Sequence, residues 1–155
     1  MLFRSHLDGT ARGGWIGLTN SHKRADLIRA VIEGVSYSQR DCLDIVAGLG
    51  VPLSSVRASG GGAKSPFWRQ LLADILGKRV VTLETQEGSA YGAALLALAG
   101  TGAYGSVPEV CRNTIRETDS VSPRAAETAY YGKAHGVYQA LYPALRGVFG
   151  KIAEL

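Results

Sequence analysis

Three consecutive glycines, Gly60, Gly61 and Gly62, lie between a short apolar segment and a strongly amphipathic one. Glycine has no Cβ atom and reaches backbone angles that are closed to other residues, so such a run marks a sharp change of chain direction. Just beyond it, Ser65 is a good N-cap and Pro66 suits the first position of a helix. The sequence therefore predicts a strand over residues 53–59, a glycine turn, and a helix over residues 66–76.

The same alternation of strand and helix patterns runs through most of the chain. Further strands are predicted over residues 14–18 and 79–83, and further helices over residues 24–49, 88–98 and 123–153. A short helical turn is expected after Ser106, followed by an extended connector over residues 115–121. Strands that alternate with helices favour an α/β fold with a parallel or mixed sheet. A chain of 155 residues predicts one core.

In the last predicted helix, apolar residues recur at helical spacing and are expected to form one buried stripe. The members of this stripe are Tyr131, Ala134, Tyr138, Leu141, Leu145, Val148 and Ile152.

Charge and composition argue against several classes of function. The net charge of +4 comes from 17 basic and 13 acidic residues spread along the chain, without the interleaved aromatic residues of a nucleic-acid surface. No apolar run approaches the roughly 18 to 20 residues that span a bilayer. Two cysteines and no leader segment indicate a reduced cytoplasm. His6, His22 and His135 lie far apart and are expected at the surface or as caps, so no metal site is predicted.

The glycine turn is the candidate ligand site. A backbone without side chains can approach a flat or charged ligand closely, and the start of the following helix favours an anion. A Walker A motif is absent because Ala58 and Ala63 stand where it needs glycine, and the Rossmann fingerprint fails at Ser65. A tight turn without a ligand is the alternative. The candidate nucleotide-binding residues are Gly60, Gly61, Gly62, Ala63, Ser65 and Pro66.

Three segments resemble, in the same order, motifs of the FGGY family of carbohydrate kinases. They are similar to its carboxy-terminal signature, its adenosine motif and the small-residue helix that follows. The segments are Gly13-Gly14-Trp15-Ile16-Gly17-Leu18 with Asp26-Leu27 and Ala30-Val31-Ile32-Glu33; Gly60-Gly61-Gly62-Ala63-Lys64-Ser65-Pro66-Phe67-Trp68-Arg69-Gln70; and Glu87-Gly88-Ser89-Ala90-Tyr91-Gly92-Ala93-Ala94. Residues 138–145 are most similar to family members that act on xylulose. The resemblance covers the chain from about residue 11 onward.

The resemblance implies an actin-like ATPase or ribonuclease H-like lobe, with a mixed sheet flanked by helices, one of two lobes that close around ATP and a sugar. It implies that Gly60, Gly61 and Gly62 border the adenosine and phosphates of ATP or ADP, with Ser65 and Pro66 beside the adenine. In such kinases the catalytic aspartate, the Mg²⁺ ligands and most of the sugar pocket belong to the amino-terminal lobe, so no catalytic residue is expected here. The catalytic aspartate has no counterpart among Asp8, Asp26, Asp44 and Asp74 of this chain.

We therefore interpret the chain as a truncated kinase, with residues 1–12 as a polar leader or loop remnant and residues 13–155 as the nucleotide-binding domain. Xylulose, converted to xylulose 5-phosphate, is the expected sugar. The alternatives are a kinase for glycerol, gluconate or ribulose, and a stand-alone nucleotide-binding module without catalysis. We predict self-association, as in a homodimer. It would occur through the edge of the strand over residues 14–18 or through the surface that faces the missing lobe. Lys64 is interpreted either as a phosphate contact or as a solvent-exposed side chain.

Overall fold

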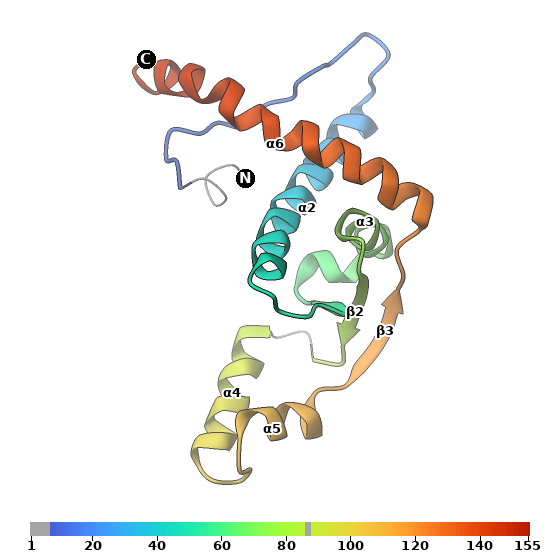
Figure 1. Ribbon diagram of the computed structural model, residues 1–155, viewed down its shortest axis with the longest axis vertical. Helices are drawn as coiled ribbons and strands as arrows, with labels where there is room; N and C mark the ends of the chain where they lie inside the picture. Colours follow the sequence, from blue (N-terminus) through green and yellow to red (C-terminus); the bar gives the residue numbers. More distant parts are fainter. Residues whose placement is uncertain (1–6, 86–87) are drawn as a thin grey trace. The chain divides into compact units, whose positions relative to one another are not determined.

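The computed structural model describes residues 7–85 and 88–155 (Figure 1). The chain divides into two compact units, although its length predicted a single core. The first unit comprises Met1–Leu53, Asp74–Gly77 and Pro123–Leu155, and the second comprises Ser54–Ala73 and Lys78–Ser122. His6 and Glu87, which entered the sequence interpretation, lie outside the described residues.

Two long helices, α2 (Arg24–Gly48) and α6 (Ala125–Ala153), pack against each other in the first unit (Figure 1). The start of α2 is fixed by Asp26, whose Oδ2 accepts a hydrogen bond from the Lys23 amide at 2.8 Å. Beyond its end, Gly50 adopts φ +77°, a left-handed conformation that favours glycine. The helices predicted over residues 24–49 and 123–153 are thus confirmed to within two residues.

The buried face of α6 differs from the predicted apolar stripe. Tyr131 is buried as expected, but Val148 and Ile152 are 49% and 45% exposed. His135 is only 4% exposed, so its predicted surface position is wrong. Its Nε2 lies 2.8 Å from Asp41 Oδ1 on α2, which satisfies a buried polar side chain. The predicted stripe therefore shares only Tyr131 with the buried face of α6. The buried residues of this helix are Tyr131, His135, Tyr142 and Phe149.

The strand predicted over residues 14–18 is also wrong, because the structure has no strand at these described residues. Trp15, Ile16 and Leu18 are all more than half exposed. The indole Nε1 of Trp15 donates a hydrogen bond to the Leu27 carbonyl oxygen at 3.2 Å, which ties this segment to α2. A strand is stable only when a neighbouring strand takes up its backbone hydrogen bonds, and local sequence does not show whether such a neighbour exists.

The second unit contains a mixed three-stranded sheet in the order β1-β2-β3. Strand β1 (Ser55–Ala58) runs parallel to β2 (Arg79–Leu83), which pairs antiparallel with β3 (Glu117–Val121). The segment expected as an extended connector therefore supplies the third strand. Helix α3 (Pro66–Leu76) connects the parallel strands and contributes residues to both units. The α/β class and the mixed sheet are confirmed.

Two shorter helices, α4 (Gly88–Gly100) and α5 (Val107–Thr114), complete the second unit and pack against each other (Figure 1). The Tyr91 hydroxyl on α4 donates to the Thr114 carbonyl oxygen at 2.9 Å. Ser106 caps α5, as its spacing to Glu109 predicted, by accepting the Glu109 amide at 3.4 Å. No helix of the described residues is both long and apolar enough to cross a membrane.

Candidate functional site

The glycine segment folds as a single 3₁₀ turn, Gly61–Lys64, between the end of β1 and the start of α3. Gly60, which precedes the turn, has φ +81° and ψ −169°, a region that is essentially restricted to glycine. Hydrogen bonds from the Ala63 amide to the Gly60 carbonyl oxygen, 3.2 Å, and from the Ser65 amide to the Gly62 carbonyl oxygen, 3.1 Å, close the turn. The predicted glycine turn is therefore a defined helical turn rather than an open loop.

The start of α3 is as the sequence predicted. Pro66 is the first helical residue, and the Ser65 hydroxyl oxygen accepts the Trp68 amide at 3.3 Å, which is the geometry of an N-cap. The helix then continues into the buried residues Leu71 and Leu72. The positive end of the α3 dipole consequently lies directly after the glycine turn.

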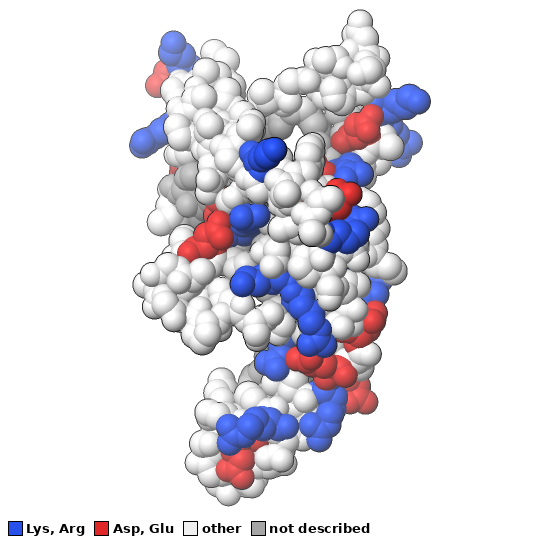
Figure 2. Space-filling model, turned by 45° about the vertical axis from the view of Figure 1, so that its right-hand side comes forward, with Lys and Arg blue, Asp and Glu red and all other residues white. Residues whose placement is uncertain are grey.

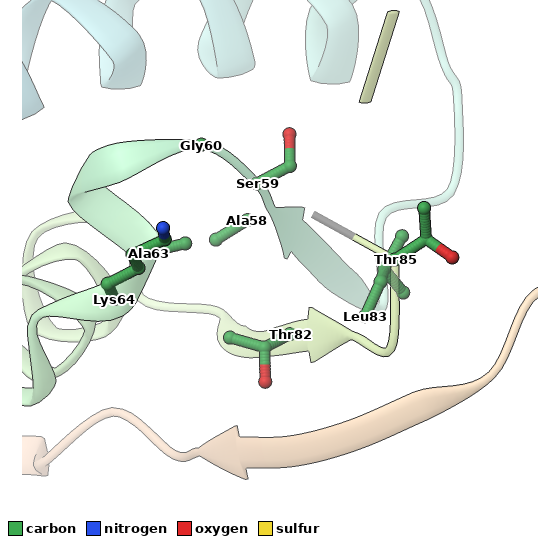
Figure 3. A pocket seen from close by; sticks show the side chains of 8 residues that line it. All are labelled: Ala58, Ser59, Gly60, Ala63, Lys64, Thr82, Leu83 and Thr85. Carbon is green, nitrogen blue, oxygen red and sulfur yellow. The ribbon is translucent and has the colours of Figure 1, made fainter. Parts of the chain in front are cut away.

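A small hollow lies beside the turn, with an empty volume of about 240 Å³ that includes open solvent. In Figure 3, β1 and the turn border it on one side and β2 on the other. Its lining residues have small or uncharged side chains, apart from one lysine. They are Ala58, Ser59, Gly60, Ala63, Lys64, Thr82, Leu83 and Thr85.

The structure brings only part of the predicted site to this hollow. Gly60 and Ala63 line it, Gly61 and Gly62 lie in the turn, and Ser65 and Pro66 form the start of α3. The sequence interpretation missed the lining residues from β2 and from the segment that follows it. A signal for them existed, because two parallel strands end at the same edge of a sheet, where α/β proteins commonly bind ligands. The missed residues are Thr82, Leu83 and Thr85, together with Ala58 and Ser59 on the β1 side.

The three glycines of the turn have different surroundings. Gly60 is needed for its backbone conformation. A Cβ atom on Gly62 would lie 3.0 Å from Cε3 of Trp68, so the indole ring requires a glycine there. A Cβ atom on Gly61 would meet nothing within 4 Å, and its φ lies outside the left-handed region. Nothing within the described protein therefore accounts for the missing side chain at Gly61.

None of the described residues that line the hollow carries a carboxylate. Among residues 7–85 and 88–155, no group of three or more His, Cys, Asp or Glu side chains could hold a metal ion. The described residues that line the hollow therefore offer none of the carboxylates through which proteins commonly bind Mg²⁺.

The four aspartates considered as catalytic bases have structural contacts. Asp74 is fully buried and accepts hydrogen bonds from the Arg124 amide, 2.8 Å, and from its Nη2, 2.6 Å. Asp26 caps α2, and Asp44 lies 3.7 Å from Arg40. Hydrogen bonds to Asp8 from the side chain of Thr10, and then from the Tyr142 hydroxyl, lower the pKa of Asp8 from 3.8 to about 2. None of these four carboxylates lines the hollow.

Charge around the sheet is largely paired. On β3, Glu117 faces Arg57 at 3.4 Å and Asp119 faces Arg69 of α3 at 2.7 Å. The Ser120 amide, and then Arg69, lower the pKa of Asp119 below its ordinary value. Basic and acidic side chains are correspondingly interspersed on the face drawn in Figure 2. Lys64 is exposed and places a basic side chain at the hollow itself.

Comparison with known proteins identifies the relatives of this chain. The C-terminal domain of the FGGY family of carbohydrate kinases matches residues 1–101. A xylulose kinase of Staphylococcus epidermidis is 37% identical over 137 residues, which are 88% of this chain and 28% of that kinase. The chain thus spans less than a third of the length of this curated relative.

Solved structures give the same result. A gluconate kinase and a ligand-bound xylulose kinase, both from Lactobacillus acidophilus, each superimpose with a TM-score of 0.84 and 30% identity. Each comparison covers 94% of this chain and 29% of the other. The likeness extends beyond the predicted motifs to almost the entire chain, and it includes the actin-like ATPase fold expected for such kinases. This chain therefore belongs to the FGGY family of carbohydrate kinases, of which it resembles the C-terminal domain.

Proposed function

We propose that this chain is the nucleotide-holding part of an ATP-dependent carbohydrate kinase of the cytoplasm. Residues 13–155 form its nucleotide-binding domain, and the glycine turn binds ATP or ADP. The observation that carries the proposal is the hollow lined by Gly60 and Ala63, together with Gly61 in the same turn, where no described protein atom within 4 Å requires a glycine. A ligand that approaches the backbone at this point would require one.

The hollow is suited to part of a nucleotide. Without the open solvent its cavity volume is only about 20 Å³, far below the ~300–1,000 Å³ of a complete small-molecule pocket. We infer that one wall is present here and that another part of a longer kinase completes it. The small side chains of Ala58, Ser59 and Ala63 leave the backbone accessible to a flat base or ribose.

Phosphoryl transfer also needs a base to accept the proton of the attacking hydroxyl, and magnesium to neutralise the phosphates. The described lining of the hollow offers neither a carboxylate base nor Mg²⁺ ligands. We infer that this chain binds and orients the nucleotide, while the base, the Mg²⁺ ligands and the sugar pocket belong to a part of the kinase outside these 155 residues. Lys64 can approach a phosphate as a point charge.

Xylulose is the sugar that we propose. Its support is the similarity of residues 138–145 to xylulose-specific family members, together with the xylulose kinases among the relatives. The gluconate kinase at the same TM-score makes gluconate the alternative.

Titration of this chain with ATP and ADP in a calorimeter, with and without Mg²⁺, tests nucleotide binding. We expect binding by the parent chain and a loss of about ten-fold or more in affinity for Gly61→Val, because the valine side chain occupies the space of the ligand. The circular dichroism spectrum should not change, since the added Cβ meets no protein atom.

Gly147→Val is the matched control. Gly147 lies on the exposed surface of α6, and a Cβ there also meets nothing within 4 Å. Its affinity should equal that of the parent chain. Equal binding by Gly61→Val and the parent would place the nucleotide elsewhere, and no binding by the parent would refute the proposed function for this chain.

A further inference from the structure

The indole ring of Trp68 lies against the backbone of the glycine turn. A Cβ atom built on Gly62 would be 3.0 Å from Cε3, 3.1 Å from Cζ3 and 3.4 Å from Cδ2 of this ring. All three atoms belong to the six-membered ring of the indole. Since the backbone of Gly62 is not in the left-handed region, the ring rather than the backbone requires the glycine. The indole ring of Trp68 therefore occupies the space in which a side chain at position 62 would lie.

Trp68 lies in the first turn of α3, which hydrogen bonds attach to the residues around it. The backbone amide of Trp68 donates to the Ser65 hydroxyl, and Trp68 itself is half-buried. The next two side chains attach the helix to the β3 region. Arg69 Nη1 lies 2.7 Å from Asp119 Oδ2, and Gln70 Nε2 donates to the Ser122 carbonyl oxygen at 3.0 Å. The indole thus supports the turn from a helix that is fixed to the sheet.

Trp68 is not among the residues that line the hollow. Any effect on a ligand there must pass through the turn, which consists of small residues and is closed by few hydrogen bonds. A short glycine-containing turn has a large conformational freedom to lose on binding, unless another part of the protein fixes it beforehand.

We propose that Trp68 is a positioning residue of the nucleotide site. Its indole holds the turn Gly61–Lys64 in the conformation that presents Gly61 to the ligand, so that binding does not have to order the turn. This inference rests on the proposed function. A site that is formed only a tenth of the time binds about ten-fold more weakly, which sets the size of the effect.

A double-mutant cycle with ADP as the probe tests the contact. Trp68→Leu removes the ring, and Gly62→Ala introduces a methyl group that displaces the turn from it. We expect each single variant to bind ADP about ten-fold more weakly, and the double variant to bind no more weakly than either single one, because the smaller leucine side chain leaves room for the methyl group. Losses that multiply to about a hundred-fold would overturn the proposal.

Trp15→Leu is the matched control, because Trp15 is the other tryptophan of the chain and is half exposed, away from the turn in sequence. Its ADP affinity should be that of the parent. Trp68→Phe retains an aromatic ring on α3 and should recover most of the affinity lost in Trp68→Leu. Failure of Trp68→Leu to weaken binding by a parent chain that does bind ADP would also overturn the proposal.

Hydrogen exchange without ligand separates this role from general destabilisation. In Trp68→Leu, exchange should accelerate at the Ala63 and Ser65 amides, which close the turn, and remain unchanged at the buried β2 residues Val80 and Val81. Equal acceleration everywhere, or none at the turn, would overturn the positioning role. Should the parent bind neither ATP nor ADP, the proposed function fails, and exchange at these amides alone decides whether Trp68 holds the turn.

Discussion

At the scale of single residues, Gly60, Gly61 and Gly62 are glycines for different physical reasons. Gly60 satisfies a backbone conformation, Gly62 makes room for an aromatic ring, and Gly61 leaves space that no described atom fills. The sequence shows three identical residues, and only their surroundings distinguish them. The stability of the protein should therefore respond differently to the same substitution at neighbouring positions.

Gly60→Ala should lower the free energy of unfolding by about 1–3 kcal/mol, because φ +81° and ψ −169° lie in a region that is essentially restricted to glycine. Gly61→Ala should change it by less than about 1 kcal/mol, and in the stabilising direction, because alanine restricts the unfolded chain at a compatible position. Urea unfolding of both variants measures the difference. Equal losses at the two positions would contradict the assignment of their backbone conformations.

At the scale of elements, α2 carries several large apolar side chains that stay exposed to solvent. Several of its apolar residues recur at helical spacing and are exposed, Ile45 by 67% and Leu49 by 77%. Exposed apolar residues that group together on a protein surface mark an interaction site or a tendency to associate. The exposed apolar residues of α2 and its C-cap are Ile28, Val31, Ile45, Val46 and Leu49.

We expect the chain to self-associate at high concentration through this face of α2. The sequence predicted two other surfaces for it, the edge of residues 14–18 and the surface that faces the missing lobe. Ile45→Lys together with Leu49→Lys should shift the equilibrium toward the monomer without loss of helix content, because both side chains are already largely exposed. Gel filtration with light scattering over a concentration series measures the mass. A parent chain that is monomeric at every concentration would show this expectation to be wrong.

At the scale of the whole molecule, a hydrogen bond between residues far apart in the sequence joins the segment at Asp8 to α6. The Tyr142 hydroxyl on α6 donates to Asp8 Oδ2 at 2.8 Å across 134 positions of sequence. The same bond raises the pKa of Tyr142, while bonds from Thr10 and Tyr142 lower the pKa of Asp8 to about 2. The charged form of Asp8 is therefore favoured in the folded protein.

The depressed pKa of Asp8 predicts a loss of stability in acid. Its contribution is present above the ordinary pKa of 3.8 and disappears as the pH falls toward about 2, where the folded protein also takes up the proton. Urea unfolding between pH 5 and pH 2 should show a smaller acid-induced loss for Asp8→Asn than for the parent chain. Identical pH profiles of the two proteins would show that this contact does not persist in solution.

Local sequence correctly predicted most elements of the fold. The bounds of β2 and the start of α3 agree with the prediction residue for residue, because apolar spacing, a serine cap and a first-turn proline are local signals. The glycine turn was also predicted, together with Gly60 and Ala63 of the hollow. The predictions that failed concern residues whose structure depends on a contact with a segment elsewhere in the chain.

The α/β class, the family and the position of the glycine turn could all be read from the residues alone, since each depends on residues close together in the chain. Three-dimensional contacts were needed to show that residues 14–18 form no strand, that β3 joins the sheet, and that His135 is buried against Asp41. The same contacts brought Thr82 and Thr85 to the hollow and Trp68 onto Gly62. Strand pairing and the burial of a polar group require two distant segments to meet, and no local pattern encodes that meeting.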